Sequence, residues 1–189
     1  IAQRKGDPIV VDTDEHPRAS TTLEALAKLK PVVTAEGTVT AGNASGINDG
    51  AAAVLIASEQ AIQVYQLKPR AKIIASTAVG VEPRIMGFAP APAIKKLLKQ
   101  ANLTLEQMDV IELNEAFAAQ ALAVTRDLGL ADDTTQVNPN GGAIAIGHPL
   151  GASGARLVTT ALNHLEQTGG TYALCSMSVS YTHLTLPTI

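Results

Sequence analysis

His148 is the residue of this sequence best suited to acid–base chemistry. It lies in a glycine-rich stretch, residues 138–156 (NPNGGAIAIGHPLGASGAR), and Pro149 follows it directly. A residue before proline is kept out of the helical conformation, so we expect the imidazole on a turn, just before a helix predicted for residues 151–167. An imidazole titrates near neutral pH, and a helix start attracts negative charge. The stretch therefore suits proton transfer beside an anionic intermediate.

A phosphate-binding loop is a second interpretation of this stretch, and its residue types exclude it. Gly142 and Gly147 have the required spacing, but His148 and Pro149 replace the lysine and the hydroxyl residue that would contact phosphate and magnesium. No G-x-G-x-x-G sequence occurs, which argues against a dinucleotide-binding turn. On local chemistry alone, a purely structural histidine with a hydrogen bond in the core stays open.

Asn114 is the second candidate, because it stands between a predicted strand over residues 110–113 and a predicted helix over residues 116–128. An asparagine in this place is by default a helix cap, and the neighbouring Glu115 would complement the helix dipole. Sites of α/β proteins gather where strands end and helices begin. We therefore expect the Asn114 and His148 side chains to converge, within about 3–6 Å.

Three motifs in sequence order resemble those of the thiolases, enzymes that make or cleave 3-oxoacyl-CoA: TAGNASGINDGAAA (residues 40–53), NEAFA (114–118) and GGAIAIGHPLGASGAR (141–156). The resemblance extends from about Gly6 to Met177 and corresponds to the C-terminal half or so of a thiolase. The stretches KGDPIVVDTDEHPRAS and VIELNEAFAAQALAV are most similar to 3-oxoadipyl-CoA thiolases of aromatic degradation.

The resemblance implies catalytic roles for His148 and Asn114. His148 would help to deprotonate a nucleophilic cysteine, and Asn114 would hold a water that donates to the thioester oxygen, as part of an oxyanion hole. The nucleophile itself belongs to the N-terminal half of the family and has no counterpart in this sequence. The implied reaction is acyl transfer between CoA thioesters through an acyl-enzyme.

The resemblance also implies contacts with the substrate. Ser45 would contact the pantetheine arm of CoA, Arg18 would lie near its nucleotide phosphates, and Met86 and Phe117 would line the acyl pocket. Local chemistry offers a plainer alternative in several cases: a helix cap for Ser45, a solvated charge for Arg18 and a core contact for Met86. No metal or further cofactor is implied, since coenzyme A is a substrate.

The predicted fold class is α/β: a thiolase-like mixed β-sheet with helices on both faces, the C-terminal half of a layered αβαβα architecture. Apolar patterns predict further elements besides those already named. These are strands at residues 9–11, 38–40, 71–79 and 171–177, and helices at 47–66 and 93–101. Thr21, with Glu24 three residues later, is expected to cap a short helix.

Pro69 is expected to mark a domain boundary, because a helix break there precedes an apolar strand. Residues 1–46 would end a CoA-binding loop region, residues 47–68 would form the last helix of the N-terminal thiolase domain, and residues 69–189 would form the C-terminal domain. A thiolase carries Cys-x-Gly where this chain has Ser178 and Ser180, so residues 178–189 are expected to be a non-native tail. Cys175 stands too early to replace that cysteine and is expected to be a small buried thiol.

Composition limits the partners. Of the 189 residues, 46% are hydrophobic and 16% are charged, and the net charge is −3. The sequence contains no run of basic residues. We therefore expect neither nucleic acid nor a membrane as partner, but CoA thioesters and a homo-oligomer in the intact protein. A single cysteine favours a reducing, cytoplasmic location. The fragment alone is expected to be inactive, and the alternative function is a non-catalytic acyl-CoA or lipid binder.

Overall fold

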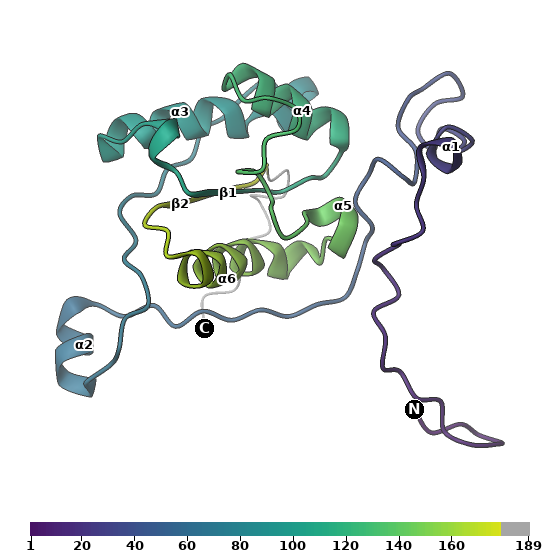
Figure 1. Cartoon of the computed structure of the whole chain (residues 1–189), viewed down its shortest axis with the longest axis horizontal. Coiled ribbons are helices and arrows are strands. Elements are labelled where there is room, and N and C mark those ends of the chain that lie inside the picture. Colours follow the sequence, from purple (N-terminus) through teal and green to yellow (C-terminus); the bar gives the residue numbers. More distant parts are fainter. Residues whose placement is uncertain (179–189) are drawn as a thin grey trace.

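The computed structural model describes residues 1–178 and forms a three-layer arrangement around a parallel strand pair (Figure 1). Strands β1 (Val110–Leu113) and β2 (Ala173–Ser176) lie between helices α3 (Pro90–Ala101) and α4 (Ala118–Asp127) on one face and α6 (Leu150–Thr168) on the other. The predicted α/β class, with helices on both faces, is therefore present. The expected change at Ser180 and the rest of the tail, residues 179–189, lies outside the described residues.

The strand pair is parallel, with Val110 opposite Ala173 and Leu113 opposite Ser176. All four residues of β1 are buried, as expected for a parallel strand covered on both faces. Ile111 and Leu113 pack with Ile94, Val124 and Leu174 into the main core. Leu157 and Ala161 of α6 are buried as well.

Three predicted helices are confirmed with small changes in their bounds. The helix predicted at 93–101 is α3, the one at 116–128 is α4 and the one at 151–167 is α6. Gly169 ends α6 in the left-handed conformation at φ +74°, where glycine carries no side-chain penalty. The strand predicted at 110–113 is β1, and the one at 171–177 is realised as the shorter β2.

The long helix predicted at 47–66 is wrong for most of its length. Only α2 (Glu59–Tyr65) is helical, capped by Ser58, and residues 47–58 run as an extended chain along the outside of the molecule (Figure 1). Ile47 and Leu55 are 92% and 84% exposed. Helices of this length depend on packing of an apolar face, and most side chains of this segment are exposed, although Asn48 and Gly50 contact the turn at residues 147–149.

The strand predicted at 71–79 is also not formed. The segment has neither strand nor helix assignment, and Ile73 and Ile74 are 67% and 54% exposed. A strand is stabilised by a ladder with a neighbour, and no such neighbour exists within residues 1–178.

In the N-terminal region the structure differs from three further predictions. No strand forms at residues 9–11, and the strand predicted at 38–40 is reduced to a single antiparallel bridge between Thr40 and Pro31. Helix α1 (Leu23–Leu26) is capped by Thr22 and not by Thr21, because the Thr22 hydroxyl reaches the backbone N–H of Ala25 at 3.2 Å.

Three short helical turns complete the described elements. They are the 3-10 helices η1 (Pro83–Phe88) and η2 (Leu105–Gln107), and the four-residue helix α5 (Ala143–Ile146). Helix η1 packs on α4, and α5 immediately precedes the turn that carries His148.

Candidate active site

The turn between α5 and α6 fixes the backbone of His148. Gly147 takes φ +94°, and a Cβ there would come within 2.5 Å of the Asn48 side-chain oxygen, so only glycine fits. The backbone N–H of His148 donates to Asn48 Oδ1 at 3.1 Å and to the Gly46 carbonyl at 3.2 Å. The NASGIND stretch and the histidine stretch are therefore in direct contact.

The imidazole of His148 is buried and oriented by hydrogen bonds. Its Nδ1 lies 2.6 Å from Ser153 Oγ, and the Ser153 hydroxyl donates its own proton to the Pro149 carbonyl at 3.1 Å. Ser153 Oγ is thus an acceptor for an Nδ1–H, which leaves the lone pair of His148 on Nε2. The side chain therefore presents Nε2 as an unprotonated, basic nitrogen.

Burial lowers the pKa of His148 below its ordinary value of 6.5, and the nearby Arg156 cation lowers it further. Both influences disfavour the imidazolium. His148 is accordingly a neutral base at pH 7.

Asn114 lies at the end of β1, where its backbone N–H extends the ladder by donating to the Ser176 carbonyl at 2.9 Å. Its side chain is fully buried, and Nδ2 lies 3.4 Å from His148 Nε2. The predicted convergence of the two side chains is confirmed. The alternative of a helix cap is wrong, because Phe117 is the N-cap residue of α4.

The Asn114 side-chain oxygen has no hydrogen-bond partner among the described residues, although it is buried. Buried polar atoms are normally paired. A donor from a bound water or substrate group would satisfy this oxygen, so the atom marks a place where a polar ligand is needed.

A buried ion pair lies beside the site. Glu112 on β1 is fully buried, and its Oε2 accepts from Arg156 Nη1 on α6 at 3.0 Å. Burial raises the pKa of Glu112, although the cation of Arg156 opposes that shift. Sequence reasoning missed Glu112, Ser153 and Arg156; the signal for the first was a carboxylate inside the apolar strand VIEL.

Cys175 lies opposite Glu112 in the strand register. Burial, and then the neighbouring Glu112, raise the pKa of its thiol to about 12. A thiol that stays protonated at neutral pH is a poor nucleophile, which agrees with the expectation that Cys175 does not replace the catalytic cysteine. The side chain is half-buried and not fully buried as expected.

Ser45 and Phe117 lie at the same end of β1 as Asn114. The backbone N–H of Ser45 donates to the Ala116 carbonyl at 3.0 Å, and Ala44 and Phe117 form an antiparallel bridge. Phe117 remains 42% exposed. Its ring is therefore available for a ligand, in addition to any packing role.

Met86 and Arg18 are less closely tied to the site. Met86 is half-buried in η1, which packs on α4. Arg18 is exposed, and no ion pair or side-chain hydrogen bond involves it among residues 1–178. The described contacts thus place Met86 near the α4 layer, and none of them joins Arg18 to His148.

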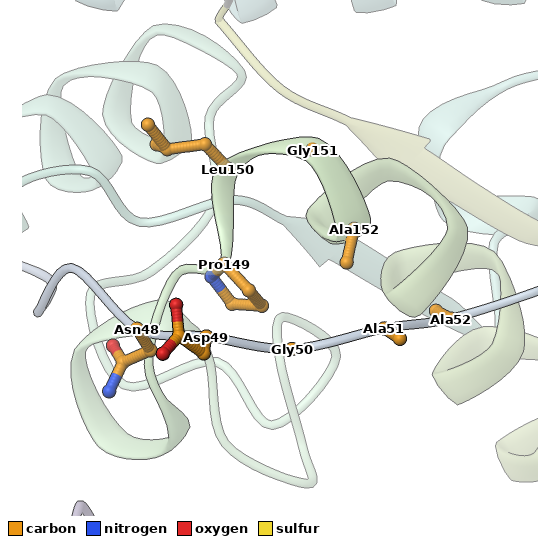
Figure 2. Close-up of a pocket in the computed structure, with 9 residues that line it drawn as sticks. All are labelled: Asn48, Asp49, Gly50, Ala51, Ala52, Pro149, Leu150, Gly151 and Ala152. Atoms are coloured by element: carbon orange, nitrogen blue, oxygen red, sulfur yellow. The ribbon is translucent and has the colours of Figure 1, made fainter.

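An open hollow of about 340 Å³ lies at the start of α6, between residues 48–52 and residues 149–152. Figure 2 shows the extended 48–52 segment passing the Pro149 ring at the start of α6. A Cβ on Gly50 would come within 2.7 Å of Pro149 Cγ, so glycine permits this close approach.

Within the described chain, no group of three or more His, Cys, Asp or Glu side chains could hold a metal ion. The helices of residues 1–178 include none that is long and apolar enough to cross a membrane.

A buried histidine beside an asparagine, at the end of a parallel strand between helical layers, characterises this α/β protein. Two family models match the chain: the C-terminal domain of thiolases over residues 67–183 and the N-terminal domain over residues 1–60. The chain belongs to the thiolase family.

Relatives make the similarity more specific. A "Beta-ketoadipyl-CoA thiolase" of Acinetobacter baylyi is 84% identical over 179 residues, which cover 95% of this chain and 45% of the relative. The "3-oxoadipyl-CoA/3-oxo-5,6-dehydrosuberyl-CoA thiolase" of Escherichia coli is 56% identical over the same shares. The chain spans less than half the length of these curated relatives.

Solved structures agree. The acetyl-CoA acetyltransferase of Bacillus anthracis is 44% identical with a TM-score of 0.86, covering 94% of this chain and 45% of that one. Human mitochondrial 3-ketoacyl-CoA thiolase in complex with CoA is 46% identical with a TM-score of 0.80, covering 89% and 42%. The predicted thiolase-like fold is thereby confirmed.

Proposed function

We propose that the protein of which this chain forms part is an active thiolase that transfers acyl groups between CoA thioesters. It would cleave a 3-oxoacyl-CoA with free CoA or form it from acetyl-CoA, with 3-oxoadipyl-CoA as the favoured substrate. The observation that carries the proposal is the buried contact between Asn114 Nδ2 and the basic Nε2 of His148, 3.4 Å apart. The 84% identity to a protein described as a beta-ketoadipyl-CoA thiolase supports the choice of substrate.

His148 is proposed as the base. Its Nε2 would take the proton of a cysteine thiol supplied by the part of the protein outside this chain. The resulting thiolate would attack the 3-oxo carbon, and the adjacent carbon–carbon bond would break, with its electron pair leaving on the enolate of acetyl-CoA. That enolate would take up a proton from an acid outside this chain and depart as acetyl-CoA, and free CoA would then take the acyl group from the acyl-enzyme. The protonated Nε2 is then a hydrogen-bond donor to the developing oxyanion, next to the amide of Asn114.

The substrate contacts are proposed partly from the surroundings of this pair and partly from the family resemblance. Ser45 and Phe117, at the same strand end, are proposed to contact the pantetheine arm and the acyl group. Met86 is proposed for the acyl pocket and Arg18 for the nucleotide phosphates, on the resemblance alone. The domain division at Pro69, a homo-oligomeric assembly and a cytoplasmic location belong to the same proposal.

A non-catalytic acyl-CoA binder is the alternative, and Ser178 would favour it if residues 178–189 were native. This residue is 9% exposed and stands where the family resemblance implies the second, proton-shuttling cysteine. A hydroxyl is far less acidic than a thiol and cannot replace it near neutrality.

A hybrid enzyme separates the two functions. Residues 1–177 would be joined to the remaining parts of the Acinetobacter baylyi relative, including its own C-terminal end, and assayed for CoA-dependent release of acetyl-CoA from 3-oxoadipyl-CoA. Thiolysis in the hybrid, but not in the 189-residue chain alone, supports the enzyme. A folded hybrid that binds CoA without turnover would support the binder.

A further inference from the structure

Glu115 joins the two segments that carry the proposed catalytic pair. Its Oε1 accepts from Asn138 Nδ2 at 2.6 Å, and its Oε2 accepts from the backbone N–H of Ile144 at 3.2 Å, in the first turn of α5. Sequence reasoning assigned this carboxylate to the dipole of the following helix. The structure instead directs it at the glycine-rich loop.

Asn138 extends this connection to the end of β1. It adopts the left-handed conformation at φ +48°. Its Oδ1 accepts from the Leu113 N–H at 2.8 Å, and its Nδ2 donates to the Leu113 carbonyl at 2.8 Å. The side chain of Asn138 thus acts as a strand neighbour for the residue directly before Asn114.

Gly142 closes the arrangement sterically. A Cβ at this position would overlap the carboxylate of Glu115. A methyl group at this position would therefore displace the Glu115 carboxylate from its present place against the loop. We call Glu115, Asn138 and Gly142 the loop clamp.

The loop clamp joins the two segments that carry Asn114 and His148. Asn114 directly precedes Glu115, and His148 comes two residues after α5, whose first turn Glu115 holds. These two segments are far apart in sequence, yet their side-chain nitrogens lie 3.4 Å apart. A shift of the loop against the strand end would therefore change that separation directly.

We propose that Glu115 is a positioning residue for the thiolase reaction, acting through the loop clamp to hold His148 Nε2 against Asn114. This inference rests on the proposed function. Glu115 is only half-buried, so its hydrogen bonds are partly replaceable by water, and their loss costs less folding stability than a fully buried pair. Catalysis is more sensitive, since misplacement by about 1 Å can cost about 100-fold in rate.

The test uses the hybrid enzyme with Glu115→Gln. The amide keeps the size of the carboxylate but offers one acceptor and one donor to two N–H groups, so one contact is lost. We expect kcat to fall about 10- to 100-fold, with KM for CoA within about twofold of the parent. Glu36→Gln, at an exposed turn, is the matched control and should keep the parent's kcat. An unchanged kcat in Glu115→Gln would overturn the proposal.

A double-mutant cycle tests the steric part. Gly142→Ala alone should lower kcat, because its methyl group displaces the carboxylate. In a Glu115→Ala background the same change should have little further effect, since the space is then empty. Additive losses would show that the two positions act independently and would contradict the loop clamp.

If the hybrid enzyme without substitutions has no activity, the proposed function is refuted. The loop clamp is then tested by an NMR measurement that does not depend on activity. The 15N resonance of His148 Nε2 reports its contact with Asn114 by NMR. The loop clamp predicts that Glu115→Gln moves this resonance and that Glu36→Gln does not. An unmoved resonance in Glu115→Gln would overturn the clamp even in an inactive protein.

Discussion

At the scale of single residues, the neutral state of His148 has a consequence for the pH dependence of the reaction. Burial and Arg156 lower its pKa below 6.5. A base must be unprotonated in the free enzyme, and kcat/KM against pH reports that pKa. We expect the acidic limb of kcat/KM for the hybrid enzyme to lie below pH 6.5.

Substitution of another histidine serves as the control. His164 lies on α6 and contacts Asn140, away from the site, so His164→Gln should leave the limb in place. A limb at or above pH 6.5 would contradict the assignment of a lowered pKa to His148.

The same lowered pKa affects stability. Between the folded and unfolded pKa values of His148, the unfolded chain binds more protons, so protonation favours unfolding. The contribution is therefore present above pH 6.5 and is lost as pH falls through the lower, folded value. Denaturant titrations of the hybrid and of His148→Gln at several pH values should converge as the pH is lowered below 6.5. A constant difference between the two would refute this linkage.

At the scale of elements, the Glu112–Arg156 pair couples β1 to α6. Glu112 is fully buried, and its second oxygen has no partner among residues 1–178. Removing one partner of a buried pair leaves an uncompensated charge, which typically costs about 3–5 kcal/mol. We expect Arg156→Met to lower the free energy of unfolding by about that amount, measured by denaturant titration.

Replacing both Glu112 and Arg156 separates the contribution of their charges to the free energy of unfolding from the contribution of their packing. The Glu112→Leu/Arg156→Met double variant removes both charges, and such replacements are often neutral or stabilising. It should recover most of the loss in Arg156→Met. A double variant at least as unstable as the single one would show that the contribution of Arg156 is mainly packing.

Sequence patterns predicted elements that carry their own signals. The α6 helix follows a helical apolar repeat and ends at Gly169, and β1 is a short apolar run before Asn114. The proximity of Asn114 and His148 was also predictable from the sequence, because both residues stand where strands or turns lead into helices. The contacts of Ser153, Glu112 and Glu115 depend on how loops and layers meet, which no local pattern encodes.

The failed predictions share a physical cause. Residues 47–58 and 71–79 have apolar patterns, yet neither forms its predicted element. Both patterns require a covering surface or a neighbouring strand. Within residues 1–178 neither segment pairs as a strand or buries an apolar face, so local propensity is not realised.

At the scale of the whole molecule, those segments leave apolar side chains in solvent, among them Leu55, Ile56 and Ile73. Surfaces of this kind promote association. We expect the 189-residue chain to self-associate in size-exclusion chromatography and the amides of residues 71–79 to exchange rapidly. In the hybrid enzyme the same amides should be protected. Equal exchange in both proteins would mean that this segment finds no partner in the larger protein.

The central claim is that the paired His148 and Asn114 perform the chemistry of a thiolase. Its most direct test is the rate of acyl-enzyme formation in the hybrid, measured as the first-turnover burst of acetyl-CoA from 3-oxoadipyl-CoA. Removing a positioned general base lowers the reaction rate by about 10²- to 10⁴-fold. His148→Gln should therefore slow the burst by about that factor and leave the affinity for CoA unchanged. A burst in His148→Gln as fast as in the parent would contradict the account.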